Sequence, residues 1–320
     1  MTAVVLAQRA FDAIAMARIA EASYAVSCDN HRTVRTLNER TVQFYSLEGR
    51  SPIRKTWSAY DVPKLIHLLP KGLNCRTLVP YCVSPELKTA TEHFSSITIL
   101  GPEASLSDYL DNKRNAKTLF HELGLPQIGP PRKAEDYKRV VKPARGSSGS
   151  QMRIEYGMFD NSDGLKQSDS WLIERFITGQ SYNINTIVSA NGHATFEPSE
   201  QVLGHHLEEV NPFAFCGNSF DTTSMDVGLR DEILFQSRMI ARKTSELGYR
   251  GCLGIDFVHD GTTGDLYPCE INPRLQNSTF LIDWLDSERK APSPLLLHLR
   301  ACRGEEVGGH MAVPSGGQLI

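Results

Sequence analysis

The 320-residue sequence predicts a protein of mixed class, with an α/β layer at the N-terminus and an α+β part after it. Three observations support this fold class. Residues 1 to about 105 alternate short β-rich runs with helical runs, which is typical of parallel α/β layering. Residues 225–247 have the apolar spacing of one long amphipathic helix. Residues 254–274 indicate a β-hairpin, because apolar and polar residues alternate on both sides of a Gly-, Asp- and Thr-rich turn.

The N-terminal layer is predicted from five short runs of strand composition and from the helical segments between them. The predicted strands are AVVLA (3–7), SYAVSC (23–28), QFYSL (43–47), TLVPYCV (77–83) and SITILG (96–101). Residues 10–22 and 59–70 are among the predicted helices. No GxGxxG sequence follows the first strand, so the fingerprint of a dinucleotide-binding fold is absent.

Charge and hydropathy exclude several classes of protein. The chain has 34 Lys and Arg against 37 Asp and Glu, and its net charge of -3 offers no global basic field for nucleic acid. Arg9 and Asp12 interrupt the apolar start, which indicates a first strand and helix and not a signal peptide. No run of eighteen apolar residues occurs, so we expect no membrane span.

The seven cysteines are dispersed along the chain, and no pair of them has CxxC spacing, which argues against a zinc ribbon. They are Cys28, Cys75, Cys82, Cys216, Cys252, Cys269 and Cys302. An odd, scattered set suits buried free thiols, and we expect a reducing, cytoplasmic location. Cys75 and Cys82 are predicted to be packing residues.

After the first layer, a helix with Gly124 as its C-cap is predicted, because its apolar spacing fits Leu110, Ala116, Leu119, Phe120 and Leu123. Lys113 lies near the start of this helix, where the macrodipole disfavours a cation. A lysine in this position is explained if an anion attracts it. The alternative interpretation is a solvated surface lysine.

A loop of small residues follows the next predicted strand. Val140 and Val141 begin that strand, and Gly146–Ser150 forms the loop. Such a loop lets backbone N–H groups approach an anion closely. It is not a Walker A loop, since Lys142 precedes the glycines and no GKS or GKT follows. Phosphate binding and a plain hairpin turn both remain open at this point.

Two strands around Gly179 are predicted between residues 171 and 196, with polar residues beside the turn. Residues 197–220 show few periodic features and are predicted to be a long loop, a kind of segment that often serves as a lid or a substrate loop. His205-His206 within it invites a metal interpretation. Because adjacent side chains point in different directions, we expect a structural or surface role for this pair.

The long helix of residues 225–247 is predicted to end at Gly248 and to bury Ile233, Met239, Ile240 and Leu247. Helical pieces broken at Ala291-Pro292 follow the hairpin, and the final residues indicate a turn entering a strand.

In the hairpin, a loop centred on Thr263 places Asp256 directly opposite Glu270, with Asn272 on the same face. Two carboxylates and an amide oxygen that converge in this way favour a hard cation, and Mg²⁺ prefers such ligands together with phosphate oxygens. A solvated polar strand face is the alternative. A register slip of one residue would pair Asp256 with Cys269 and remove the site.

Taken together, the motifs resemble those of the ATP-grasp superfamily over roughly residues 100–280. The resemblance rests on five elements in order, namely Lys113, Lys142-Pro143 with Gly146-Ser147-Ser148-Gly149, Glu174-Arg175-Phe176-Ile177-Thr178-Gly179, Gly254-Ile255-Asp256-Phe257, and Glu270-Ile271-Asn272-Pro273-Arg274. It implies a pre-ATP-grasp layer in residues 1–107, a lid subdomain in 108–175, and a large subdomain with the metal site in 176–320.

The resemblance also implies the role of each site residue. ATP would lie between the two subdomains with one or two Mg²⁺ ions, Mn²⁺ being an alternative. The phosphates would contact Lys113, Lys142 and the loop Gly146, Ser147, Ser148 and Gly149. Adenine would contact Glu174, Arg175, Phe176 and Ile177, whereas Gln180 stands where an acidic residue usually meets the ribose. The metal ligands would be Asp256, Glu270 and Asn272. The catalytic cations would be Arg274, Lys142 and Arg145, and the substrate contacts would be Glu200, Gln201, Arg274 and Asn277.

The implied reaction is ATP-dependent ligation of a carboxylate to an amine, such as an amino acid or peptide, through an acyl phosphate. D-alanine–D-alanine ligases have an arginine where this chain has Gly254, so Arg274 or Arg145 is expected to stabilise the charge. The alternatives are a carboxylase, a purine-pathway ligase, or a nucleotide-binding module without catalysis. The expected partners are a small carboxylic acid and an amine, and a homodimer follows only by analogy.

Overall fold

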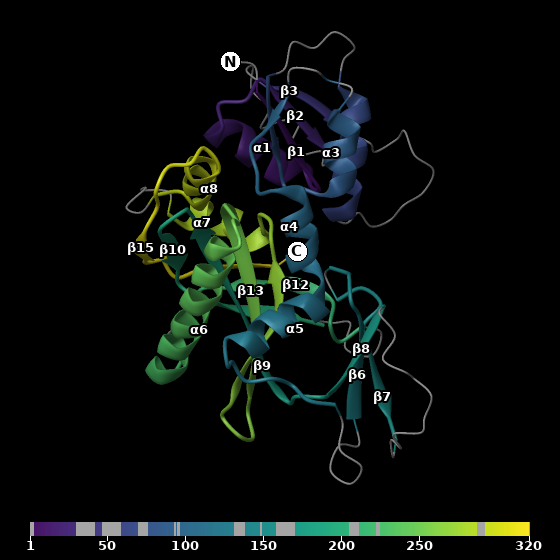
Figure 1. Cartoon of the computed structure of the whole chain (residues 1–320), viewed down its shortest axis with the longest axis vertical. Helices are drawn as coiled ribbons and strands as arrows, with labels where there is room; N and C mark the ends of the chain where they lie inside the picture. The colour runs from purple at the N-terminus through teal and green to yellow at the C-terminus, as the bar shows by residue number, and fades with distance from the viewer. Residues whose placement is uncertain are drawn as a thin grey trace.

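The computed structural model describes residues 3–29, 42–46, 59–69, 76–92, 94, 97–130, 138–147, 149–157, 170–204, 211–221, 225–286 and 292–319. These residues form three β-sheets with helices packed on them (Figure 1). The predictions for Cys75, Ser148 and the pair His205-His206 lie outside the described residues.

The first sheet is built from the five strands predicted at the N-terminus, and all of its pairings are parallel. Its order is β3-β2-β1-β4-β5. The strands are β1 (Ala3–Ala7), β2 (Tyr24–Ser27), β3 (Gln43–Ser46), β4 (Thr77–Pro80) and β5 (Thr98–Ile99). The accompanying helices are α1 (Ala10–Ile19), the 3₁₀ helix η1 (Ala59–Leu68) and α3 (Pro85–Thr91). The predicted parallel layer is thereby confirmed.

The prediction that Leu110 lies on the same helix as Ala116 and Phe120 is wrong. The structure has two helices, α4 (Ala104–Asp111) and α5 (Lys113–Glu122). The chain is extended at Asn112, whose side-chain oxygen accepts a hydrogen bond from the N–H of Arg114 at 2.9 Å and so begins α5. Gly124 follows the C-cap of α5 with a positive φ of 70°, as predicted for the residue that ends this helix.

The second sheet is small and antiparallel, with the order β7-β6-β8. Its strands are β6 (Lys138–Pro143), β7 (Arg153–Tyr156) and β8 (Trp171–Arg175). The third sheet has eight strands, and its main path is β14-β13-β9-β11-β12-β16. Off this path, β10 pairs with β9, and β15 pairs with β10. These strands are β9 (Gly179–Val188), β10 (His193–Phe196), β11 (Ser199–Leu203), β12 (Phe215–Ser219), β13 (Gly251–Asp260), β14 (Leu266–Asn272), β15 (Gly309–Met311) and β16 (Gly317–Leu319).

Two predictions about the third sheet are corrected. Residues 171–196 hold three strands and not two, and Gly179 is not the turn of a hairpin, because β8 and β9 belong to different sheets. At Gly179 a Cβ would lie 1.8 Å from the carbonyl oxygen of His259 on β13, so glycine permits this close strand pairing. Residues 197–220 are also not one long loop, since they contain the antiparallel strands β11 and β12.

Helix α6 (Val227–Glu246) packs on the third sheet, where it buries Ile233 and Ile240 and partly buries Met239. The prediction that Leu247 is a core residue is wrong, since Leu247 is 45% exposed. Leu247 is the C-cap of α6, and Gly248 with φ 96° turns the chain away from the buried stripe. Two shorter helices, α7 (Asn277–Leu285) and α8 (Pro294–Cys302), contact α1 of the N-terminal layer, and α8 also packs on β9 and β13 of the third sheet.

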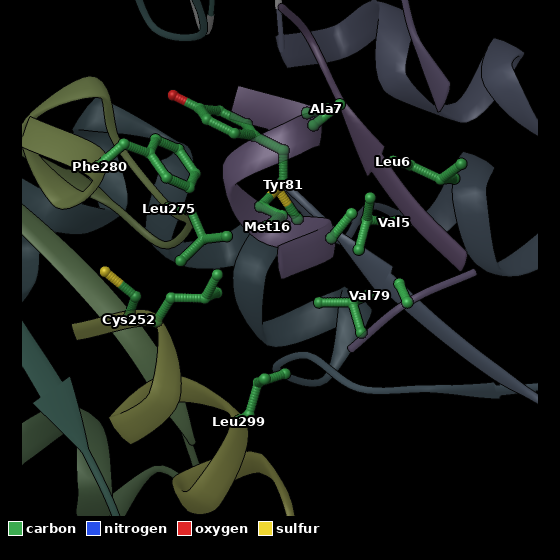
Figure 2. Packing of buried hydrophobic residues seen from close by; sticks show 14 of the residues in the cluster. Val5, Leu6, Ala7, Met16, Val79, Tyr81, Cys252, Leu275, Phe280 and Leu299 are labelled. Atoms are coloured by element: carbon green, nitrogen blue, oxygen red, sulfur yellow. The ribbon is translucent and has the colours of Figure 1, made fainter. Parts of the chain in front are cut away.

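One apolar core joins the first sheet to α7 and α8. Figure 2 shows Tyr81 next to Phe280 and Leu275, with side chains of β1 and β4 on the other side. The backbone continues this contact, because Tyr81 N–H donates to Leu6 O at 2.6 Å and Leu275 N–H donates to Tyr81 O at 3.1 Å. The C-terminal end of strand β4 is therefore held beside the residues that follow β14.

The predicted segments 1–107, 108–175 and 176–320 contain the first, second and third sheet respectively, and the division into domains stays a prediction. The six described cysteines are free thiols. Within the described residues, no helix combines the length and apolar character that crossing a lipid bilayer requires.

Candidate active site

A cleft of about 460 Å³ opens where the three sheets meet. The first sheet contributes the residues that follow β1 and β4, the second sheet contributes β6 and β8, and the third contributes β9, β11, β13 and β14. Part of the wall is apolar, and it includes Ile128, Val140, Met152, Phe176, Ile177, Phe213 and Phe257. The rest of the wall carries the charged and amide groups described below.

Most of the predicted site residues form this wall. They are Lys142, Ser147, Gly149, Glu174, Arg175, Phe176, Ile177, Gln180, Gln201, Asp256, Glu270, Asn272, Arg274 and Asn277. Lys113 and Gly146 lie close behind the wall, since Lys113 contacts both Glu270 and Gly146. Arg145 and Glu200 are not part of the described wall.

The carboxylate pair lies where the hairpin prediction placed it. Asp256 on β13 is the cross-strand partner of Glu270 on β14, and Gly254 is opposite Asn272, so the predicted register is confirmed. Just beyond Asp256 the register shifts at a β-bulge, where Phe257 lies opposite Pro268.

The two carboxylates of this pair differ in charge state. Burial and the neighbouring charge of Glu270 raise the pKa of Asp256 to about 7. Burial also opposes the charge of Glu270, but Lys113 outweighs it and lowers the pKa of Glu270 to about 2. Of these two facing acids, only Glu270 is readily ionised. Both can carry a negative charge only when a further cation lies beside them.

The side chains around Asp256 suit a hard divalent cation. Asn183 and Asn272 donate amide N–H groups to the two oxygens of Asp256, at 2.6 and 3.0 Å. Asn272 turns its own amide oxygen to Arg274, so metal coordination by Asn272 requires its amide to rotate by about half a turn. No group of three His, Cys, Asp or Glu side chains converges among the described residues. Two carboxylates with amide oxygens fit Mg²⁺, which takes its remaining ligands from water and phosphate.

Lys113 is the first residue of α5 and is 4% exposed. Its Nζ lies 2.8 Å from Glu270 Oε2 and donates to the backbone oxygen of Gly146 at 3.0 Å. The sequence suggested that an anion attracts this lysine against the helix dipole, and the structure provides the carboxylate of Glu270. Lys113 thus connects the carboxylate pair to the small-residue loop.

A second buried ion pair lies on β6 and β8. Lys142 Nζ is 2.7 Å from Glu174 Oε2, and the other oxygen of Glu174 pairs with Lys117. Burial opposes the charge of each group, yet the Glu174 carboxylate raises the pKa of Lys142 and the two lysines lower the pKa of Glu174. Lys142 therefore stays cationic, and it lines the cleft.

The loop of small residues approaches the opposite wall. Gly149 has φ 70°, and a Cβ there would lie 1.9 Å from the backbone oxygen of Phe213. Phe213 belongs to the segment just before β12, and Asn211 of the same segment donates to Gly149 O at 3.5 Å. The absence of a side chain at position 149 lets the loop close the cleft from the side of the second sheet.

Two predicted residues lie elsewhere. The guanidinium of Arg145 forms a fork with both carboxylate oxygens of Asp108 on α4, and its side chain is 42% exposed. Glu200 alternates with Gln201 along β11, and because Gln201 lines the cleft, Glu200 faces the other side of the sheet. Of the two arginines proposed to stabilise charge, only Arg274 therefore lines the described cleft.

The residues expected to frame a nucleobase lie at the junction between β8 and β9. Arg175 is held in place by Tyr267, whose hydroxyl accepts at 2.8 Å, and by Asp260 at 3.3 Å. Gln180 donates to the backbone oxygens of Ser181 and Gln201. The role of these residues in nucleotide binding stays a proposal.

A network of buried amides underlies the carboxylate pair. Asn183 donates to Gln276 Oε1 at 2.8 Å, Gln276 Nε2 donates to Asn185 at 3.3 Å, and Ser278 donates to Asn183 at 2.8 Å. Gln276 lies against Gly254, where a Cβ would meet its amide atoms at 2.0 to 2.2 Å. The position at which D-alanine–D-alanine ligases have an arginine is thus filled by the Gln276 amide.

Gly254→Ala is expected to lower the free energy of unfolding by about 2 kcal/mol, because a methyl group would displace Gln276 and break two buried hydrogen bonds worth about 1 kcal/mol each. Urea denaturation measures this change. Gly129→Ala is the control, since no atom lies within 4 Å of a Cβ there. In a Gln276→Ala background, Gly254→Ala should cost little, and additive losses would contradict the proposed clash.

Some residues of the site were not predicted from the sequence. They are Lys117, Asn183, Gln276, Phe213 and Tyr81. Lys117 could have been found, because it is four residues after Lys113 and so lies on the same face of α5. The others reach the cleft through sheet pairing or core packing between distant segments, for which the sequence carries no local signal.

Comparison with known proteins gives one family match. A family model described as an ATP-grasp domain matches residues 111–278, slightly more than half of the chain. Among curated proteins, the butirosin acyl-carrier protein–L-glutamate ligase of Niallia circulans is 24% identical over 241 residues, which are 67% of this chain and 55% of that protein. The chain thus spans about half the length of that relative.

Solved structures share the fold at low sequence identity. Biotin carboxylase from Campylobacter jejuni aligns with a TM-score of 0.71 at 14% identity, over 99% of this chain and 74% of that one. The L-amino acid ligase from Bacillus licheniformis aligns with a TM-score of 0.63 at 12% identity, over 95% of this chain and 74% of that one.

Proposed function

Because the chain belongs to the ATP-grasp family, we propose that it is an ATP-dependent ligase that joins a carboxylate to an amine and releases ADP and phosphate. The observation that carries the proposal is the arrangement of charge in one cleft. Asp256 and Glu270 face each other, and Lys142 and Arg274 line the same wall, with Lys113 directly behind Glu270. These are the charges that phosphoryl transfer to a carboxylate requires.

The proposed reaction has two steps. A carboxylate oxygen of the acid forms a bond to the γ-phosphorus of ATP, and the bond from that phosphorus to the β,γ-bridging oxygen breaks, so ADP leaves with the electron pair. The amine nitrogen then attacks the acyl carbon, phosphate leaves, and the nitrogen loses a proton. Forming the acyl phosphate is necessary because a free carboxylate has no adequate leaving group.

Residues of this chain would support the first step by neutralising charge. Lys142 and Lys113 would approach phosphate oxygens, and Arg274 would orient an oxygen of the acid or of the transferring group. Asp256 and Glu270, with Asn272 after rotation of its amide, would hold Mg²⁺, which screens phosphate charge when it is bound. The approach of Gly149 to Phe213 would exclude water from the reactive intermediate.

The type of substrate is supported by two of the similar proteins, which are named as an L-glutamate ligase and an L-amino acid ligase. Gln201 and Asn277 line the cleft and would contact the substrates. A carboxylase is the second candidate, since the fold aligns with a biotin carboxylase over 99% of this chain. A module without catalysis is disfavoured, because the described cleft keeps both carboxylates and its phosphate-directed lysines.

Analysis of the nucleotide product tests this proposal. The protein is incubated with ATP, Mg²⁺, pooled carboxylic acids and pooled amines, with Lys142→Ala as the impaired control, and ADP is resolved from AMP. We expect ADP and phosphate only when both an acid and an amine are present. AMP with pyrophosphate would contradict the acyl-phosphate route, and ADP formed with bicarbonate alone would favour the carboxylase.

A further inference from the structure

Tyr81 is a buried residue whose side-chain hydroxyl forms no hydrogen bond with the described residues. It follows β4 of the first sheet, is 3% exposed, and lines the cleft. Among the described residues, no group forms a hydrogen bond with the Tyr81 hydroxyl. The hydroxyl oxygen is also not completely enclosed by protein atoms. A buried tyrosine hydroxyl normally has a partner, so one that opens to a cleft without a partner indicates a ligand.

Arg274 lies over the ring of Tyr81, with its guanidinium carbon 5.9 Å from the ring centroid. Its two hydrogen bonds go to uncharged oxygens, those of Asn272 at 2.6 Å and of the Leu275 backbone at 3.3 Å. A guanidinium has five N–H donors, so most of them remain available. Within the described residues no carboxylate forms an ion pair with Arg274. The charges of Asp111 and Glu270 help to raise its pKa without a direct contact, so its remaining N–H groups can still donate to an anion.

Asn277 supplies a third unused group beside them. It is the first residue of α7 and lines the cleft, and its side-chain amide forms no hydrogen bond within the described part of the chain. Its neighbours Gln276 and Ser278 take part in the buried amide network. One cation, one hydroxyl and one amide thus face the cleft with hydrogen-bonding capacity to spare.

We propose that Tyr81, together with Arg274 and Asn277, binds the carboxylate of the acid substrate. The inference rests on the proposed ligase function and adds a substrate-binding residue that follows a strand of the N-terminal sheet. A carboxylate accepts several hydrogen bonds, and a guanidinium, a hydroxyl and an amide N–H can provide them together. Arg274 bonds to Asn272, which bonds to Asp256, so this subsite adjoins the carboxylate pair where phosphoryl transfer is proposed.

Packing supports the role of Tyr81. Its ring stacks on Phe280, with ring centroids 6.2 Å apart, and Leu275 lies beside it (Figure 2). The ring is therefore fixed, and little conformational entropy is lost when the hydroxyl meets a ligand. Burial raises the pKa of Tyr81 to about 12, so the hydroxyl keeps its proton at neutral pH and can donate it to a carboxylate oxygen.

The test uses two variants of the full chain. Tyr81→Phe removes only the hydroxyl and keeps the ring under Arg274, whereas Tyr81→Leu also removes the ring. With the pooled amines present throughout, the probe is whichever of acetate, succinate, L-glutamate and benzoate most stimulates ADP formation by the wild type. For Tyr81→Phe we expect KM for the acid to rise by about tenfold, as for loss of a hydrogen bond to a charged group, with KM for ATP and kcat within twofold. For Tyr81→Leu we expect kcat to fall as well, because Arg274 loses its support.

Tyr249→Phe is the matched control, since it removes a buried hydroxyl that donates to the backbone of Cys252 away from the cleft. It should leave KM for the acid unchanged. An unchanged KM for the acid in Tyr81→Phe overturns the Tyr81 contact while leaving the ligase proposal intact. A wild type whose ADP formation responds to none of the four acids counts against the ligase proposal and against this inference with it.

Discussion

Glu270→Gln is expected to lower kcat by on the order of 10³-fold, which makes it the most damaging single substitution in the cleft. Glu270 is the only member of the facing pair that is fully ionised at neutral pH, since Lys113 lowers its pKa to about 2 whereas that of Asp256 is raised to about 7. Removing its charge leaves the site without a permanent anion for a divalent cation. Steady-state ADP formation at saturating ATP and Mg²⁺ measures the loss.

Glutamine is the informative replacement at this position because it keeps an oxygen. Lys113 is buried and lies 2.8 Å from Glu270, so a variant without any acceptor would leave an unpaired buried charge and destabilise the protein. A glutamine oxygen together with Gly146 O still satisfies Lys113 in part. Glu246→Gln on the exposed face of α6 is the control, and it should retain full activity. Wild-type turnover by Glu270→Gln would remove the metal-site proposal.

Divalent-metal affinity is expected to rise by about tenfold per pH unit up to pH about 7 and then to level off, because binding displaces about one proton from Asp256. Over two units this amounts to about a hundredfold. Mn²⁺ binding followed by EPR between pH 5 and 8, without nucleotide, measures the slope. Asp256→Asn should flatten the profile, and a wild-type affinity independent of pH below 7 would contradict the assignment.

The same two carboxyl groups affect stability in opposite directions in the metal-free protein. Asp256 keeps its proton in the folded state at pH values where the unfolded chain has lost it. Its contribution to the free energy of unfolding therefore falls as pH rises from about 4 to about 7. The pKa of Glu270 is lowered, so its stabilising contribution is present above about pH 4 and is lost as pH falls towards about 2. Bound metal should remove the loss of folding stability that Asp256 causes at neutral pH.

The sequence predicted those parts of the molecule that depend on local pattern. All five N-terminal strands form, because each is a short apolar run between polar segments. The hairpin register was also predictable, since the turn and the alternation of residues place Asp256 opposite Glu270. The lysine of α5 was recognised because a cation at a helix N-terminus is unfavourable without an anion.

The incorrect predictions arise where long-range contacts decide the structure. Residues 197–220 have a weak strand pattern, and β11 forms because β9 and β12 provide pairing partners on both sides. Arg145 follows the right motif, but the neighbouring helix α4 offers it Asp108. Tyr81 lies far from the hairpin in sequence, and only packing against Phe280 and Leu275 brings it to the cleft.

The shared core of the first sheet and α7 has a consequence for dissecting the protein into fragments. A chain trimmed to residues 111–278 would keep Asp256, Glu270 and Arg274 but would lose Tyr81 and all of β1. Leu275, which is fully buried, would then face water, and its N–H would lose the carbonyl oxygen of Tyr81. The segment that matches the family model would therefore keep the apolar core around Ile184, Ile233 and Ile255, but it would lose the second core, which Leu275 shares with the first sheet.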